Sequence, residues 1–152
     1  MNSWKQTAFT FAAFLLVTPA SSQDRPSYEE TVQYIVDRTS FRNPNSNLRY
    51  ALEFPERCTI KYSNVYPDMV VAHTVAAKDL DPAEVEGRNG EFRDIFLITR
   101  ENREMVQWAN TDGRRRTAAS MHIFVHIGAE GTRVGRAFEN LIRLCGGQEE
   151  LF

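Results

Sequence analysis

The sequence predicts an α+β protein, namely an antiparallel β-sandwich or partly open barrel of about seven strands with an N-terminal helix and a capping C-terminal helix. Apolar residues recur at helical spacing near both ends of the chain and alternate along short segments between them. The connections between these segments are too short for parallel crossovers, which favours antiparallel pairing. With 152 residues, 42% hydrophobic and 25% charged, the composition is that of one ordinary globular domain.

Residues 1–22 are predicted to be an export signal. Lys5 precedes an apolar run, Ala8 to Val17, which has about half of the roughly 20 residues that a membrane-spanning helix needs. Pro19 and the small residues after it favour cleavage before Gln23. We therefore expect a mature domain of residues 23–152, without a transmembrane anchor, in the periplasm or outside the cell.

The first predicted helix starts at a capping box. Ser27 and Glu30 have the spacing at which a hydroxyl and a carboxylate satisfy two free backbone donors. One apolar face follows, at Tyr28, Val32, Ile35 and Val36. The helix is expected to end near residue 38 or 39.

The middle of the chain changes to a period of two. The predicted strands cover residues 48–54, 58–63, 69–77, a short segment at Val85, 92–99, 105–110 and 117–127. The first two are close enough to pair as a hairpin. The stretch from Gly87 to Gly90 is predicted to be a turn.

The last element returns to helical spacing. Apolar residues from Val134 to Cys145 make a broad stripe, and Gly146 and Gly147 supply a helix stop. Residues 133–146, RVGRAFENLIRLCG, are similar to the closing helix of small exported bacterial proteins of unknown function. The element order resembles the pleckstrin-homology-like β-sandwich. That resemblance implies a fold often used for binding and brings no catalytic residues.

Cys58 and Cys145 are predicted to form a disulfide. Both lie in the exported part, where a pair of cysteines is usually oxidised. Each falls on the apolar face of its predicted element, so both thiols point into one core. The alternative is that each is a small buried apolar residue.

Arg114, Arg115 and Arg116 form the densest charge cluster. On a hairpin loop, three guanidinium groups could hold a phosphate or a carboxylate through bidentate hydrogen bonds. The alternative is a solvated loop whose charges keep the sheet edge soluble. If the strand starts early, Arg115 projects opposite to the other two.

Other residues suggest chemistry less specifically. His122 and His126 lie on a predicted strand, where their rings stand roughly 13 Å apart and cannot share a metal ion. Ser120 is similarly too far from His122 for a direct hydrogen bond. Aromatic residues could line a groove for an apolar ligand, but strand aromatics are usually core: Tyr62, Tyr66 and Trp108.

The sequence therefore predicts an exported, noncatalytic binding domain for a protein, peptide or envelope component. The alternative is a binder of a small anionic or lipid-like ligand at Arg114 to Arg116. We expect no metal and no cofactor, because hydrolase, zinc and phosphate-loop motifs do not occur. A pI near 5.9 argues against nucleic acid as a partner.

Overall fold

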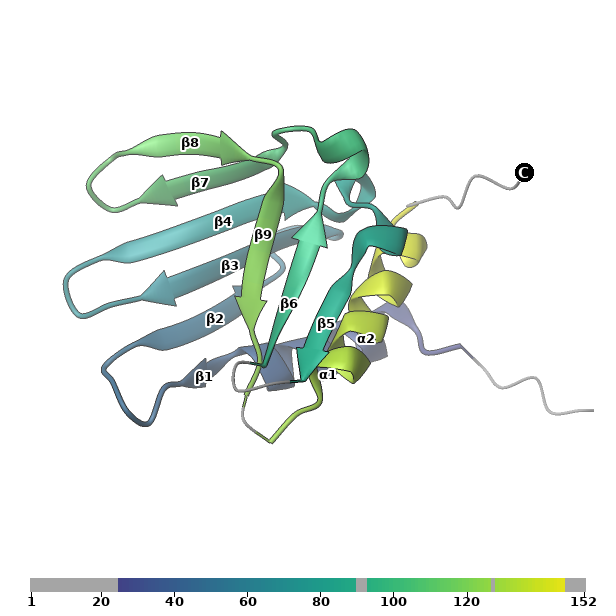
Figure 1. The fold of residues 1–152 in the computed structure, drawn as a ribbon, viewed down its shortest axis with the longest axis horizontal. Helices are drawn as coiled ribbons and strands as arrows, with labels where there is room; N and C mark the ends of the chain where they lie inside the picture. The colour runs from purple at the N-terminus through teal and green to yellow at the C-terminus, as the bar shows by residue number, and fades with distance from the viewer. Residues whose placement is uncertain (1–24, 90–92, 127, 147–152) are drawn as a thin grey trace, which may run out of the picture.

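A computed structural model describes residues 25–89, 93–126 and 128–146 and confirms the predicted α+β class. Antiparallel strands form two sheets that do not close into a barrel, and a helix stands at each end of the described chain (Figure 1). The predicted export signal, residues 1–22, lies outside the described residues. The elements in chain order are α1 Tyr28–Thr39, β1 Phe41–Arg42, β2 Arg49–Glu53, β3 Thr59–Val65, β4 Val70–Ala76, the 3-10 turns Ala77–Asp79 and Pro82–Glu84, β5 Glu86–Asn89, β6 Arg93–Ile98, the 3-10 turn Arg100–Asn102, β7 Val106–Asn110, β8 Arg115–Ala118, β9 Ser120–Phe124 and α2 Gly131–Leu144.

The larger sheet has the order β1-β2-β3-β4-β7-β8, and the smaller sheet has the order β5-β6-β9. The smaller sheet runs across the front of the larger one and covers only part of it (Figure 1). The hairpin ends of β3, β4, β7 and β8 extend beyond this cover. The core lies where the sheets and helices meet, and its largest fully buried side chains include Tyr62, Phe138, Ile35, Ile60 and Leu80.

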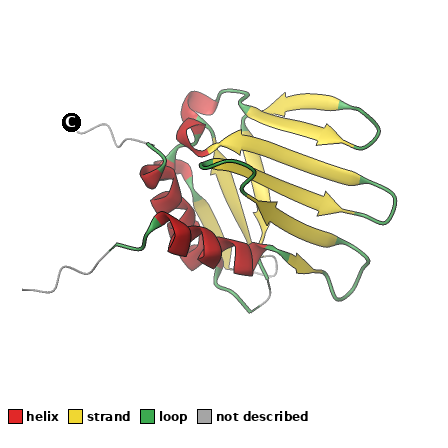
Figure 2. Cartoon of the chain, turned by 180° about the vertical axis from the view of Figure 1, so that it is seen from behind, coloured by secondary structure: helices red, strands yellow, loops and turns green. Residues whose placement is uncertain are grey.

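Helix α1 begins as predicted. The Ser27 hydroxyl accepts a hydrogen bond from the Glu30 backbone N–H at 3.2 Å, and the Glu30 carboxylate accepts one from the Ser27 N–H at 2.8 Å. These two bonds satisfy donors that a helix start leaves free. The helix lies beside α2, and Figure 2, which views the molecule from behind, shows both helices at one end of the sheets.

The predicted turn at residues 87–90 is wrong over its described part, because Gly87 to Asn89 lie inside β5. Gly87 is needed for packing rather than for turning. A Cβ built on Gly87 would overlap the Gly131 carbonyl oxygen, and one on Gly131 would overlap the Arg88 carbonyl oxygen. Two glycines thus let β5 cross the first turn of α2 at backbone contact.

The predicted single strand over residues 117–127 is also wrong. The chain leaves the larger sheet after β8 and enters the smaller sheet at β9, changing sheets at Ala119. The Ala119 carbonyl oxygen accepts a hydrogen bond from the Thr99 N–H at 2.9 Å. Apolar alternation continues across this point because both halves bury one face. The two-residue strand β1, which pairs with β2, was not predicted.

The predicted disulfide is confirmed. Cys58 and Cys145 are bonded with a Cα–Cα distance of 5.7 Å and a sequence separation of 87. Cys58 lies just before β3 with φ 64°, not on the strand face, and its N–H donates to the Tyr28 hydroxyl at 3.0 Å. The bridge therefore joins the end of α2 to the start of β3, beside α1.

Candidate functional site

One row of side chains crosses four strands of the larger sheet. Tyr62 is opposite His73, His73 is opposite Trp108, and Trp108 is opposite Arg116. Residues paired in this way project from the same face of a sheet. Tyr62 is fully buried, His73 and Trp108 are half-buried, and Arg116 is exposed. The row thus begins under the smaller sheet and ends at the open edge.

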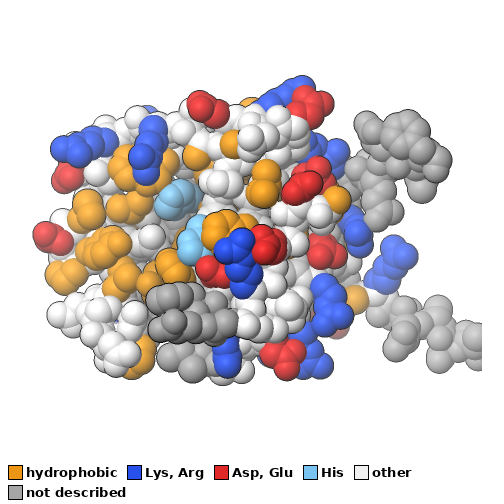
Figure 3. All heavy atoms as spheres, in the orientation of Figure 1, with side chains coloured by type: hydrophobic (Ala, Val, Ile, Leu, Met, Phe, Trp, Pro, Cys, Tyr) orange, Lys and Arg blue, Asp and Glu red, His pale blue; other side chains and the backbone are white. Residues whose placement is uncertain are grey.

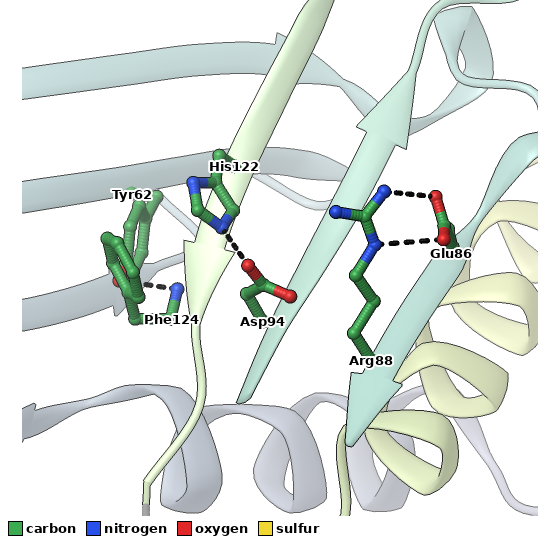
Figure 4. A network of polar contacts seen from close by, with 6 residues as sticks. All are labelled: Tyr62, Glu86, Arg88, Asp94, His122 and Phe124. Atoms are coloured by element: carbon green, nitrogen blue, oxygen red, sulfur yellow. Dashed lines mark hydrogen bonds and ion pairs between the residues drawn. The ribbon is translucent and has the colours of Figure 1, made fainter. Parts of the chain in front are cut away.

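The smaller sheet contributes a second group. His122 on β9 is opposite Phe96 on β6, and their rings stack with centroids 4.4 Å apart at 9°. Phe124 contacts the same imidazole at 4.5 Å. The His122 Nε2 is 2.7 Å from the Asp94 Oδ2 (Figure 4). Two aromatic rings and one carboxylate therefore fix the position of this imidazole.

Arg88 on β5 extends this group. Its guanidinium lies 4.3 Å from the centre of the Phe96 ring. It also makes two hydrogen bonds of 2.8 Å to the Glu86 carboxylate (Figure 4). Hydrogen bonding to Arg88 lowers the pKa of Glu86, and the same contact raises the pKa of Arg88. Both groups are therefore charged over the whole physiological range.

His73 connects the two groups. Its pKa is lowered, mainly because burial disfavours the charged ring and next because the Arg116 guanidinium is near, while an interaction with the Tyr62 backbone opposes these effects. The charge of His122 also lowers the pKa of His73, as the smallest of these effects. Histidine side chains lie among hydrophobic ones on this face (Figure 3).

We call the connected surface the strip. Its members are Arg88, Asp94, Phe96, His122, His73, Trp108 and Arg116. At its outer end, the Arg116 guanidinium lies 4.4 Å from the centre of the Trp108 ring. A hollow of about 570 Å³ adjoins that end, and its lining includes Trp108, Arg115 and Arg116.

Buried polar atoms with unmet hydrogen-bonding capacity lie at or beside the strip. Among the described residues, the Asn64 Oδ1, His73 Nδ1 and Asp94 Oδ1 have no hydrogen-bond partner. The Asp94 side chain is only 9% exposed. Most buried polar atoms in proteins are paired, so unpaired ones are exceptions that need an explanation, such as a functional role.

The three predicted ligand-binding arginines do not all project from one face of the sheet. The Arg114 N–H donates to the Asn110 side chain at 2.9 Å within the turn. Arg115 and Arg116 are the first two residues of β8 and project from opposite faces. All three are exposed. Only Arg116 belongs to the strip, and ligand binding by the three remains a prediction.

The other candidate residues are separate. His126 lies beyond β9, with its ring 5.5 Å from Phe41. In the part of the chain that the structure describes, three or more possible metal ligands do not come together. Tyr62 does not line a groove, because its buried hydroxyl accepts a hydrogen bond from the Phe124 N–H at 2.9 Å. Burial raises the pKa of this hydroxyl.

Sequence reasoning missed the contact between His122 and Asp94. Each residue falls on an alternating strand, and the pattern predicts which face of that strand it occupies. The pattern does not predict the register between β6 and β9, which places the two side chains beside each other.

Comparisons of the chain with protein-family models, with curated proteins and with solved structures found no match. The pleckstrin-homology-like resemblance therefore remains a prediction. Among the described residues, no helix combines the length and apolar character that crossing a membrane requires.

Proposed function

We propose that this chain is an exported, noncatalytic binding domain that holds an extended segment of a partner protein on the strip. The observation that carries this proposal is the pair of arginine–aromatic contacts, Arg88 over Phe96 on the smaller sheet and Arg116 over Trp108 on the larger one. Histidine and hydrophobic side chains gather on the same face (Figure 3). Tryptophan, other aromatic residues and arginine are the types that carry most binding energy in protein interfaces.

The surroundings of His122 suit recognition. The His122 Nε2 is hydrogen-bonded to the Asp94 carboxylate, and the Phe96 and Phe124 rings pack against the imidazole. Within the described residues, its Nδ1 has no hydrogen-bond partner, and the side chain is 37% exposed. The strip thus presents a polar atom on a fixed aromatic support, where a partner's backbone or side chain can reach it.

The charges indicate the chemistry of the partner. Arg114, Arg115 and Arg116 are exposed at the outer end, while Asp112 is the acidic residue of the same turn. Arg88 at the other end is already paired with Glu86. We therefore expect the bound segment to place an acidic side chain near Arg116 and apolar side chains along Trp108 and Phe96.

A displayed library of random peptides, selected on the oxidised mature protein, tests this proposal. Selected peptides are expected to combine acidic and apolar residues. Trp108→Ala should weaken their binding by about 2 kcal/mol, or roughly 30-fold, as measured by fluorescence anisotropy. Arg116→Gln should weaken it several-fold.

Arg57→Gln is the matched control, because the Arg57 guanidinium also lies over an aromatic ring, 4.3 Å from the centre of Tyr28. It should leave the affinity unchanged. Equal affinity for the Trp108→Ala and original proteins would reject the strip as the binding surface. A requirement for anions or lipids instead of peptides would support the second candidate, a small ligand in the hollow beside Arg115 and Arg116.

Export has its own test. The disulfide supports an oxidising compartment. When a bacterial host secretes the protein, its intact mass should be that of residues 23–152. Before reduction the mass should be lower by two hydrogen atoms, which disulfide formation removes. Retention of residues 1–22, or a mass that reductant does not change, would contradict this part of the proposal.

A further inference from the structure

A second hollow is lined by residues of α1 and α2 and lies apart from the strip. These two helices lie side by side at one end of the molecule (Figure 2). The hollow encloses about 560 Å³, which is within the range of small-molecule sites. Its lining includes Thr31, Tyr34, Arg133, Arg136, Ala137 and Asn140. No role was predicted for this place, and the proposed function does not use it.

The helical repeat explains why the hollow exists. Residues three and four apart share a helix face, so Arg133, Arg136 and Ala137 lie together on α2, opposite Thr31 on α1. Thr31 and Ala137 are short, while the residues around them are long. The packed helices therefore leave a space that the larger side chains surround but do not fill.

The floor of this hollow is fixed before any ligand binds. The Asn140 Nδ2 donates a hydrogen bond to the Thr31 Oγ1 at 2.9 Å, which ties α2 to α1. On the α1 side, the Arg38 guanidinium lies 3.7 Å from the centre of the Tyr34 ring and donates to the Tyr34 carbonyl oxygen at 3.2 Å. A preorganised floor lowers the entropic cost of binding.

The rim carries cationic groups that a ligand can use. Arg136 is exposed and, within the described residues, makes no ion pair. Arg133 makes a long contact of 3.4 Å with Glu130. Glu30 also lines the hollow on the α1 side, and its carboxylate accepts the Ser27 N–H at 2.8 Å. That hydrogen bonding lowers the pKa of Glu30, so it stays negatively charged and favours a ligand carboxylate on the α2 side. A ligand thus meets apolar surface at Tyr34 and Ala137 and guanidinium donors on the α2 side.

We propose that this hollow binds a small, soluble organic carboxylate, with its apolar body on Tyr34 and Ala137 and its carboxylate at Arg136 and Arg133. Guanidinium groups recognise carboxylates through paired, charge-assisted hydrogen bonds. The aromatic ring and the methyl groups of the floor provide apolar surface for the rest of the molecule. The proposal is independent of peptide binding on the strip.

Three probes separate the contribution of the carboxylate from that of the apolar body. They are 4-phenylbutyrate, which has both, the neutral 4-phenylbutan-1-ol, which lacks the carboxylate, and butyrate, which lacks the aromatic ring. Each is titrated into the oxidised mature protein while backbone amide signals are followed by NMR. We expect 4-phenylbutyrate to shift the signals of Thr31, Ala137 and Asn140. The alcohol and butyrate should each bind roughly fivefold more weakly, because each lacks one part of the recognition.

Two substitutions, each with a matched control, test the site. Arg136→Gln should weaken 4-phenylbutyrate binding toward the affinity of the alcohol, with Arg133 retaining part of the interaction, while Arg49→Gln on β2, outside both hollows, should have no effect. Ala137→Leu should fill the hollow and abolish the shifts, and Ala137→Ser should preserve them. If the leucine variant does not fold, the arginine variants and the probe series still decide the question.

The proposal is overturned if the alcohol binds as tightly as 4-phenylbutyrate, if Arg136→Gln has no effect, or if the shifts occur around Trp108 instead. Vesicles containing anionic phospholipid are the final comparison. Binding to vesicles without any response to soluble 4-phenylbutyrate would also overturn it, because the source of the anion would then be a membrane. These results do not depend on peptide selection, so the two proposals can fail separately.

Discussion

Replacing Cys58 and Cys145 together by alanine tests how the fold is stabilised. The bridge closes a segment with a sequence separation of 87. For that length, the chain-entropy model gives a loss of about 4.6 kcal/mol in the free energy of unfolding at 25 °C. A domain of this size is typically stable by about 5–15 kcal/mol, so the loss should be a third or more of the total. The left-handed backbone at position 58 stays equally unfavourable for alanine.

Urea unfolding, followed by circular dichroism at pH 7 and 25 °C, measures this difference. We expect the double variant to be about 3–5 kcal/mol less stable than the oxidised protein, with a larger denaturant slope because its unfolded chain is more expanded. The original protein under reductant is the control and should behave like the variant. A difference below about 1 kcal/mol between oxidised and variant proteins would refute the entropic reasoning.

Three further predictions concern residues in and around the sheets. Gly87→Ala should destabilise the fold by about 3 kcal/mol or more because its Cβ overlaps backbone, whereas Gly128→Ala, whose nearest neighbour is a side-chain atom at 3.4 Å, should be nearly neutral in urea unfolding. Tyr62→Phe should cost about 1–3 kcal/mol, since the Phe124 N–H loses its acceptor; an unchanged midpoint would exclude a role for this bond. Because the pKa of His73 lies below its ordinary 6.5 in the folded protein, the unfolded chain binds this proton more readily. Stability should therefore fall as pH drops below about 6.5, and His73→Gln should reduce that slope in pH-dependent unfolding.

Local patterns predicted the elements that local forces determine. The capping box at Ser27 and Glu30 is sufficient to start α1 wherever the helix later packs. Alternation predicted β2, β3 and β4 because each has one buried face. The predictions failed where a partner distant in sequence decides the conformation. Gly87 resembles a turn residue, but its role comes from the approach of α2, about 44 positions later in the chain.

The candidate site was predictable only in fragments. The sequence identified His122, Trp108 and the arginines around Arg116 as noteworthy residues. It did not predict that β8 and β9 belong to different sheets, so that Arg116 ends the row on the larger sheet while His122 lies on the smaller one. Strand register and sheet membership are tertiary properties, and periodicity along one strand does not encode them.

The positions of the stabilising contacts make the binding proposals testable. The disulfide and the contact between Gly87 and Gly131 both involve α2 or its C-terminal cap. Trp108 and Arg116 belong to β7 and β8, strands of the larger sheet that extend beyond the smaller sheet (Figure 1). Substitutions at sites without shared partners usually add in their effects on stability. Trp108→Ala should therefore cost the same stability in the oxidised protein and in the double cysteine variant. If the two effects add, the Trp108→Ala substitution does not disturb the end of the oxidised protein that holds α1 and α2. A loss of peptide binding in oxidised Trp108→Ala can then be assigned to the strip.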